Sequence, residues 1–464
     1  MSDRLHRCAR RSFLGLGLAG GASWLTLGPH LAQAGGSRVA AKNVLLIYEQ
    51  GGMSQVDTFD PKPDAPSDHR SPYKPISTNV PGIQFTELSA KTAKVADKLA
   101  IVRSMHHRDG AVNGHPDGTQ YALSGEVPGG PVEMPDIGGV AAHRTGSPCS
   151  YLPAYIMVPG NHEQNAMTRQ GFLPPHTKVF KTGGRDISDP RWQVPNLGLL
   201  DGVDQRRFHD RTDLLSNLNI GVAAAGARNV GGMQALREQA GDMLTNPATR
   251  GAFQLQEESD AVRDRYGRGH RGQCYLLGRR LIERGVRFVT VDVLEPETAS
   301  TPGGFIMNWD HHDLIYTNGS CGTVREKAGG EGRYGIGTWQ MMGSTDQALA
   351  ALIGDLHERG LLAETLVIFA TEFGRTPRLN KFQGRDHWAY GYSHLFAGAG
   401  VPGGQVIGRT DKEGGYVIEK PYLPDDVAAT IYEKLGIDRS RPIYTPQQRP
   451  VFLAGHGKKI EELF

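Results

Sequence analysis

Three short segments of the sequence concentrate the residue types that bind metal ions or move protons. Residues 308–313 read Asn-Trp-Asp-His-His-Asp, residues 371–377 read Thr-Glu-Phe-Gly-Arg-Thr-Pro, and residues 384–388 read Gly-Arg-Asp-His-Trp. Carboxylates and imidazoles that converge on one cleft are natural ligands of a divalent cation such as Zn²⁺ or Mn²⁺. Such ions stabilise the attacking and leaving oxygens when a phosphoryl or sulfuryl group is transferred. The segments therefore predict a metal centre suited to ester hydrolysis.

A structural alternative exists for each charged residue in these segments. Glu372 can pair with Arg375, and Arg385 with Asp386 can form an exposed ion pair. Taken alone, such residues are more often structural than metal ligands. Three clusters in loops that follow strands shift the balance towards a metal site, because several ligand types recur in one place.

Buried strands that follow amphipathic helices are the elements that would bring the segments together. Strands are predicted at residues 43–48, 286–293 and 365–370, with weaker candidates at 99–103 and 154–158. Continuous apolar strands after amphipathic helices are typical of a parallel sheet that is covered on both faces. The sequence thus predicts an α/β fold: a doubly wound, mostly parallel sheet with helices on both faces and long loop insertions. In such folds ligands bind just past the carboxyl ends of the strands.

The first 34 residues have the pattern of a bacterial twin-arginine signal peptide. The arginine pair at residues 10–11 precedes a weakly apolar run, and Ala-Gln-Ala at residues 32–34 supplies a small-x-small cleavage site. We therefore expect the twin-arginine translocase to export the protein to the periplasm or cell envelope. Residues 35–464 are predicted to form a single domain. An uncleaved membrane anchor is the alternative.

Charge and hydropathy exclude several classes of protein. The chain has 51 basic and 49 acidic residues, and without residues 1–34 it has 47 and 48. A balanced charge argues against a nucleic-acid partner, since such proteins usually carry clustered Lys and Arg. No apolar run of about 20 residues follows the leader, so no stable membrane span is expected after cleavage.

The sequence also resembles a known bacterial family of exported proteins, the domain-of-unknown-function 1501 family. The resemblance rests on motifs at residues 51–63, 309–312, 372–377 and 384–388, and it runs from about Asn43 to the C-terminus. The fold of this family is similar to that of alkaline phosphatases and sulfatases. The resemblance therefore implies an alkaline-phosphatase-like domain with a centre for divalent metal ions, of which Zn²⁺, Mn²⁺, Mg²⁺ and Ca²⁺ are the candidates.

The same resemblance implies which residues stand at that centre. His115 occupies the place of the sulfatase nucleophile, so we expect it to act as a ligand or base. Arg375 is expected to hold an anionic group, because its planar fork matches tetrahedral oxyanions. The alternative nucleophiles are Ser54, Ser104 and Thr119. The metal ligands implied are Asp57, Asp310, His312, Glu372, Asp386 and His387.

Two functions of different classes fit these observations. The first is an exported metal-dependent hydrolase that acts on phosphate or sulfate esters of a small molecule or glycan. The alternative is a catalytically silent relative that binds an anionic ligand, a glycan or a partner in the cell envelope. The alternative is favoured by the absence of a standard nucleophile, since a shared fold does not establish shared chemistry.

Overall fold

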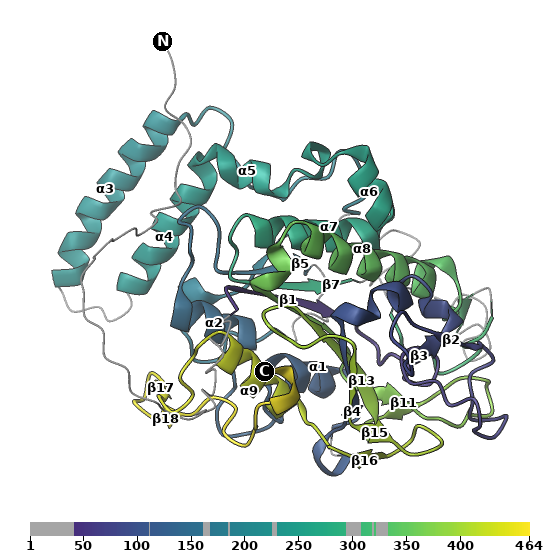
Figure 1. Cartoon of the computed structure of the whole chain (residues 1–464). Coiled ribbons are helices and arrows are strands. Elements are labelled where there is room, and N and C mark those ends of the chain that lie inside the picture. The colour runs from purple at the N-terminus through teal and green to yellow at the C-terminus, as the bar shows by residue number, and fades with distance from the viewer. Residues whose placement is uncertain are drawn as a thin grey trace, which may run out of the picture. The chain divides into compact units, whose positions relative to one another are not determined.

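An eight-stranded sheet organises the part of the chain that the structure describes (Figure 1). In the computed structural model the described residues are 41–110, 112–160, 168–183, 186–224, 230–293, 308–317, 320–321 and 333–464. The predicted signal peptide lies outside these residues. The described residues belong to one compact unit.

The strand order of the sheet is β14-β4-β13-β10-β1-β7-β5-β6. All neighbouring strands are parallel except at β13, which runs antiparallel to both β10 and β4. The strands are β14 (Gln405–Ile407), β4 (Ala100–Met105), β13 (Tyr392–Ala397), β10 (Thr365–Ala370), β1 (Asn43–Tyr48), β7 (Phe288–Asp292), β5 (Tyr155–Pro159) and β6 (Phe180–Lys181).

The central strands form where the sequence has uninterrupted apolar runs. β1 reads NVLLIY and β10 reads TLVIFA, and both are buried on both faces. They pair in parallel from Asn43↔Thr365 to Tyr48↔Ala370, so their carboxyl ends lie side by side. The predicted α/β class, with a mostly parallel sheet, is confirmed.

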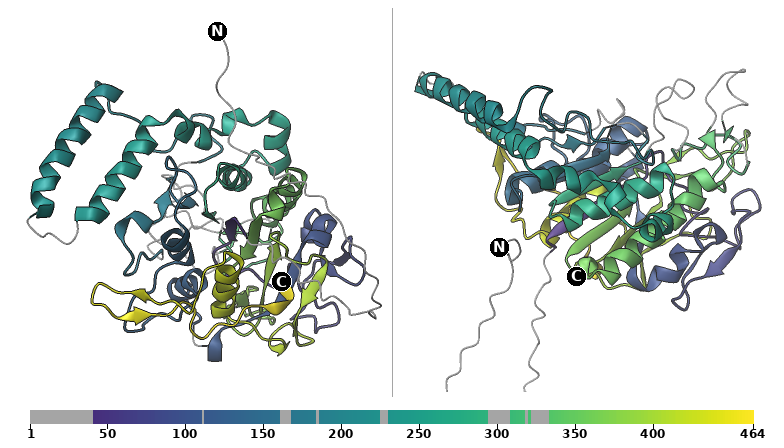
Figure 2. Two further views of the ribbon diagram at one scale, coloured as in Figure 1. Left: turned by 60° about the vertical axis from the view of Figure 1, so that its left-hand side comes forward. Right: turned by 90° about the horizontal axis from the view of Figure 1, so that it is seen from above.

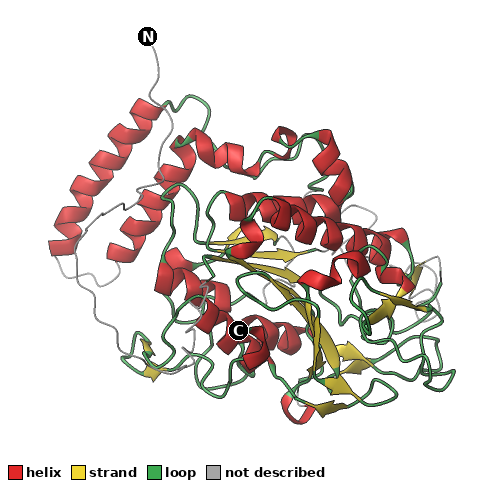
Figure 3. Cartoon of the chain, in the orientation of Figure 1, coloured by secondary structure: helices red, strands yellow, loops and turns green. Residues whose placement is uncertain are grey.

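Helices cover both faces of the sheet, as Figure 3 shows by secondary structure. On one face Leu45 and Ile47 pack in a core with α7 (His270–Glu283) and α8 (Ser344–Glu358). On the other face the core contains residues of α1, α2 and α9. Those three helices span His115–Ser124, Ile137–Thr145 and Pro424–Lys434.

The remaining helices and strands surround this sandwich. Helices α3 and α4 run side by side at one side of the sheet (Figure 2). Among the described residues, no helix has the length and apolarity needed to cross a membrane. The helices outside the sandwich are α3 (Gln205–Ala224), α4 (Val230–Thr245), α5 (Pro247–Phe253) and α6 (Asp260–Tyr266). The short strands pair as β2 (Pro75–Ser77) with β3 (Gln84–Thr86), β8 (Ser320–Cys321) with β9 (Arg333–Tyr334), β11 (Gly374–Arg375) with β12 (His387–Trp388), β15 (Arg409–Thr410) with β16 (Val417–Glu419), and β17 (Ile443–Tyr444) with β18 (Pro450–Val451).

Candidate metal centre

Side chains from four segments meet beyond the carboxyl ends of β1 and β10. His115 is the first residue of α1, and Glu372 lies two residues after the end of β10. The antiparallel ribbon of β11 and β12 pairs Arg375 with His387, which places both side chains on the same face. Asp310 and His312 come from the loop at residues 308–317, which packs against the end of β1.

Three imidazoles and one guanidinium converge on a single carboxylate oxygen. Oδ1 of Asp310 lies 3.0 Å from Nε2 of His115, 2.8 Å from Nε2 of His312 and 3.0 Å from Nε2 of His387. Nη2 of Arg375 lies 2.7 Å from the same oxygen. His115, Asp310 and His387 offer ligand atoms within 4.8 Å of one another. We call the three histidines and Asp310 the Asp310 cluster.

The outer nitrogen of each imidazole is held by a fixed acceptor. Nδ1 of His115 lies 2.7 Å from Oε1 of Glu372, and Nδ1 of His312 lies 2.7 Å from Oδ1 of Asp386. Nδ1 of His387 lies 2.8 Å from the carbonyl oxygen of Asn113. Because these partners only accept hydrogen bonds, each Nδ1 carries a hydrogen. In a neutral imidazole the inner Nε2 then carries no hydrogen, and its lone pair is available to a metal ion.

This arrangement is the one that metal-binding histidines adopt. A metal-bound imidazole usually donates its outer N–H to a carboxylate or a backbone carbonyl, which fixes the ring. Nε2 of His312 and Nε2 of His387 lie only 3.0 Å apart, and Nε2 of His115 is buried without a hydrogen-bond partner in acceptable geometry. Three imidazole nitrogens beside one carboxylate oxygen fit a divalent cation. Glu372 and Asp386, expected as ligands, instead hold the outer nitrogens of His115 and His312.

Asp310 and His115 stabilise each other's charged forms. Burial disfavours the charge of Asp310, but Arg375 and the three imidazoles in contact with the carboxylate outweigh this effect and hold the pKa of Asp310 well below its usual value. Burial lowers the pKa of His115, whereas its contacts with the carboxylates of Asp310 and Glu372 raise it, to about 9 overall. The negative charges of Asp310 and Glu372 are thus balanced by the protonated imidazole of His115 and by the guanidinium of Arg375. A divalent cation would balance the same charges.

The surroundings also shift the pKa values of Glu372 and His387. Burial raises the pKa of Glu372, yet the hydrogen bond and the charge of His115 lower it to below its usual value overall. Burial and the positive charges of Arg375 and His115 lower the pKa of His387, and together they outweigh the opposite effect of the Asp310 carboxylate. His387 therefore favours the neutral form, in which imidazole is a metal ligand.

Arg375 is buried, and protein groups engage its guanidinium on all sides. Its Nε donates to the carbonyl of Gly52 at 2.9 Å, and Nη1 donates to the carbonyl of Arg385 at 3.0 Å. Nη2 contacts the carbonyl of Gly51 and the carboxylate of Asp310. The side chain has no exposed surface. Arg375 therefore braces Asp310 and the turn after β1, rather than presenting a free fork to a substrate.

Asp57 lies in a different buried network. Its Oδ2 accepts from Nε of Arg385 at 2.8 Å and from the hydroxyl of Ser54 at 2.6 Å. Its Oδ1 accepts from the hydroxyl of Tyr316 at 2.9 Å. These contacts are with Arg385, Ser54 and Tyr316 rather than with the Asp310 cluster. The structure therefore does not bring Asp57 together with the other predicted ligands.

None of the three alternative nucleophiles hydrogen-bonds to the Asp310 cluster. Ser54 donates to Asp57, and Thr119 exchanges a 2.7 Å hydrogen bond with the hydroxyl of Tyr48. Ser104 is buried on β4, against Gly408. Among the described residues, no hydroxyl or thiol hydrogen-bonds to any of the three cluster imidazoles.

Sequence reasoning missed Glu49, the residue that follows β1. Glu49 has no exposed surface and contacts the guanidinium of Arg271, the hydroxyl of Tyr275 and the indole of Trp309. Its position directly after a predicted strand was the available signal. Asn113, whose carbonyl orients His387, left no signal because a backbone carbonyl has no side-chain signature.

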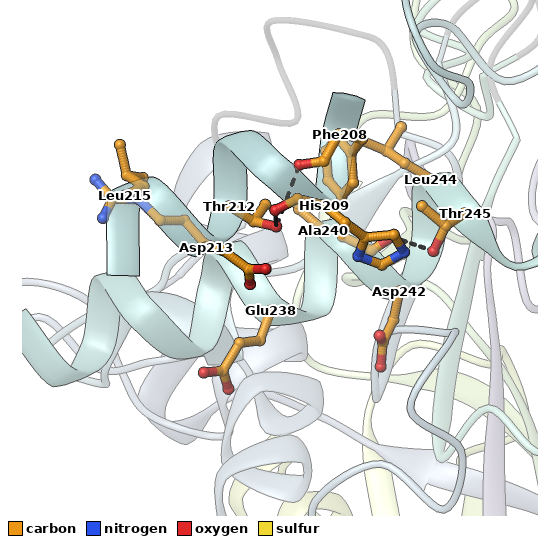
Figure 4. A pocket seen from close by; sticks show the side chains of 12 residues that line it. Phe208, His209, Thr212, Asp213, Leu215, Glu238, Ala240, Asp242, Leu244 and Thr245 are labelled. Carbon is orange, nitrogen blue, oxygen red and sulfur yellow. Dashed lines mark hydrogen bonds between the residues drawn. The ribbon is translucent and has the colours of Figure 1, made fainter. Parts of the chain in front are cut away.

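A separate cavity of about 440 Å³ lies between α3 and α4 (Figure 4). Phe208 and Leu244 give it an apolar side, and Asp213, Glu238 and Asp242 also line it. The hydroxyls of Thr212 and Thr245 are bound to carbonyls of their own helices. None of the lining residues belongs to the Asp310 cluster.

Fold and site define an α/β protein with a histidine- and carboxylate-lined candidate metal centre at the carboxyl edge of its sheet. The chain belongs to the DUF1501 family, described as proteins of unknown function, whose profile matches residues 41–464. No curated protein matches the sequence at a significant level.

Solved structures with a remotely similar fold include hydrolases of phosphorus and sulfur esters. The phosphonate monoester hydrolase of Agrobacterium radiobacter is 14% identical, with 91% of this chain and 77% of that chain covered and a TM-score of 0.39. The PsFucS1 sulfatase from Pseudoalteromonas sp. is 11% identical, with 87% and 70% covered and a TM-score of 0.35. Alkaline phosphatase from the Antarctic bacterium TAB5 is 10% identical, with 86% and 99% covered and a TM-score of 0.33. Such remote likenesses assign no substrate or activity to this chain.

Proposed function

We propose that this protein is a metal-dependent hydrolase of phosphate or sulfate esters, with a divalent cation held by the Asp310 cluster. One observation carries the proposal. Three imidazoles turn their Nε2 atoms towards one carboxylate oxygen, while each Nδ1 is anchored by a separate acceptor. This pattern is costly to build for structure alone, because it crowds four nitrogens around one oxygen.

The donor set favours Zn²⁺ or Mn²⁺ over Mg²⁺ or Ca²⁺. Imidazole suits transition metals, whereas Mg²⁺ and Ca²⁺ prefer cages of oxygen ligands. The cluster offers three nitrogens and one carboxylate. His115, His312, His387 and Asp310 would hold the ion.

The residues around the cluster have distinct supporting roles. When bound, the ion would supply a Lewis acid that polarises the ester and lowers the pKa of a water molecule. Glu372 and Asp386 fix the ring orientations of His115 and His312. Since no described hydroxyl or thiol bonds to these imidazoles, we favour direct attack by water over a covalent intermediate on the protein.

A catalytically silent binding protein is the second candidate, and the state of Arg375 favours it. The guanidinium is buried and engaged with three backbone carbonyls and Asp310, so it offers a substrate no free fork. A protein that holds a metal ion and binds an anion or a glycan without turnover would need no such fork.

Substrate and location follow from the leader and the composition. We propose that residues 1–34 direct export through the twin-arginine translocase to the periplasm or cell envelope. The substrate would be an ester of a small molecule or glycan, and neither nucleic acid nor a lasting membrane span is proposed.

Elemental analysis and two ester assays test the proposal. Protein purified without chelator is expected to hold zinc or manganese and to hydrolyse an aryl phosphate or an aryl sulfate. Replacing one ligand, as in His312→Ala or Asp310→Asn, should remove most of the metal and of the turnover. His456→Ala is the matched control, because His456 is an exposed histidine outside the cluster.

The outcomes separate the two candidates. Bound metal without turnover on either ester class would favour the binding protein. If the purified protein holds no divalent metal, and if Asp310→Asn and His312→Ala change neither metal content nor stability, the metal centre is refuted.

A further inference from the structure

The buried indole of Trp309 links the candidate ligand Asp310 to the interior of the fold. Trp309 has no exposed surface and immediately precedes Asp310. Its Nε1 donates to Oε2 of Glu49 at 2.8 Å. We propose that Glu49 is a positioning residue for the metal centre and acts on Asp310 through Trp309. This inference rests on the proposed function for its effect on metal binding.

Both oxygens of Glu49 are held by hydrogen bonds, so this residue can serve as an anchor. Its two oxygens meet Nε and Nη2 of Arg271 at 3.2 and 3.1 Å. Arg271 and Tyr275 both belong to α7, and the hydroxyl of Tyr275 donates to Oε1 at 2.7 Å. An ionised group held by several donors in a buried site is strongly constrained. The anchor therefore transmits the position of α7 to the loop that carries Asp310.

The backbone after β1 reinforces the same link. Trp309 donates its backbone N–H to the carbonyl of Gln50 at 3.0 Å. Gly51 has φ +111°, and a Cβ at this position would lie 2.3 Å from the backbone nitrogen of Trp309. The carbonyl of Gly51 also contacts Arg375, which in turn holds Asp310. Two routes, one through Trp309 and one through Arg375, thus fix Asp310 against the end of β1.

Tyr275 provides a matched control for this role. Tyr275 and Trp309 are both fully buried, and each donates one hydrogen bond to the Glu49 carboxylate. Only Trp309 is adjacent to a candidate ligand. Tyr275→Phe and Trp309→Phe therefore remove the same kind of bond from the same acceptor, and they differ in whether Asp310 is attached to it.

The test compares full-length wild type, Trp309→Phe and Tyr275→Phe in three measurements. Thermal unfolding reports the structural cost, and competition with a chromophoric chelator reports zinc affinity. Amide hydrogen exchange of the metal-free protein reports the order of residues 308–317. We expect both variants to lower Tm, and only Trp309→Phe to weaken zinc binding, by about tenfold. Exchange at residues 308–317 should increase in Trp309→Phe alone.

Each outcome decides the question. Equal zinc affinity and equal exchange in the two variants would overturn the inference and leave Glu49 a structural residue. If wild type binds neither zinc nor manganese, the proposed function fails, and hydrogen exchange alone still shows whether Trp309 positions the loop. Trp309→Phe also shrinks a buried ring, so a second variant replaces Trp309 by 3-benzothienylalanine, which keeps the bicyclic ring and removes only the N–H; it also serves if Trp309→Phe does not fold. The same shifts are expected from it.

Discussion

Two buried glutamates follow neighbouring parallel strands, yet they have different partners. Glu49 follows β1 and is bound by Arg271, Tyr275 and Trp309, all of which are themselves buried. Glu372 lies just past β10 and is bound by the partly exposed imidazole of His115, the backbone N–H of Gly51 and the hydroxyls of Tyr48 and Thr371. A carboxylate at a strand end is therefore not in itself evidence of chemistry. The role of the carboxylate depends on its partner. A guanidinium holds Glu49 in place, whereas Glu372 in turn orients the imidazole of His115, which is a candidate metal ligand.

The comparison predicts that Glu49 matters most for stability. Glu49→Ala would remove the carboxylate that faces the buried charge of Arg271, and it would leave the donors of Tyr275 and Trp309 unpaired. Removing one partner of a buried ion pair costs about 3–5 kcal/mol. Denaturant unfolding should show a loss of this size in the free energy of unfolding. A loss below about 1 kcal/mol would break the distinction between the two glutamates.

The Glu372 side of the sheet is expected to respond to acid through a buried histidine. Nε2 of His394 on β13 lies 3.3 Å from the backbone nitrogen of Thr371, next to Glu372. Burial lowers the pKa of His394 to about 4, so the unfolded chain binds the proton first as pH falls. His394 should therefore contribute a fall in stability of about 3 kcal/mol between pH 6.5 and pH 4, and its contribution should level off below that range.

The difference between wild type and His394→Gln isolates this contribution, since glutamine does not titrate. Free energies of unfolding measured from pH 7 to pH 4 should diverge for the two proteins over that window. Parallel curves would show that His394 takes no part in the acid response.

Glu372→Gln is expected to lower metal affinity more than stability. The amide keeps the volume but no longer presents a charged acceptor to Nδ1 of His115. Loss of such an orienting group typically weakens metal binding by about 10–100-fold. Chelator competition measures the affinity, and unfolding of the metal-free protein measures the cost to the fold. Equal stability losses in Glu372→Gln and Glu49→Gln would remove the contrast between the two positions.

The smallest effect is expected at the opposite ends of the same two strands. Lys42 precedes β1 and Glu364 precedes β10, and their side chains form a 2.6 Å ion pair that is mostly exposed. Exposed pairs contribute about 0–1 kcal/mol. Lys42→Ala should leave metal binding unchanged and stability within that range. A larger loss by thermal or denaturant unfolding would show that the amino ends of these strands are more tightly coupled than their exposure indicates.

The sequence predicts the sheet well where apolar runs are continuous. Strands expected at residues 43–48 and 365–370 have those bounds in the structure, because both faces of each strand are buried. It also anticipates that residues from distant loops meet at the carboxyl edge, as His115, Asp310 and His387 do.

What the sequence does not reveal is how each polar group is satisfied. Arg375 is engaged largely by backbone carbonyls, which any residue could supply. Asp57 pairs with Arg385, which is 328 positions away along the chain. Such pairings depend on tertiary placement, so residue type alone cannot distinguish a structural carboxylate from a ligand.

The scattered origin of the Asp310 cluster ties metal binding to completion of folding. His115 and Glu372 are 257 positions apart, and Asp310 and His387 are 77 apart. Contacts over such separations form late in folding, because the entropy cost of closing a long loop comes before the contact can stabilise the chain. An unfinished or clipped chain would bring together at most a fraction of the donors. Metal content of this protein would therefore report on whether the whole sheet has been assembled, and loading of the proposed centre would follow folding rather than guide it.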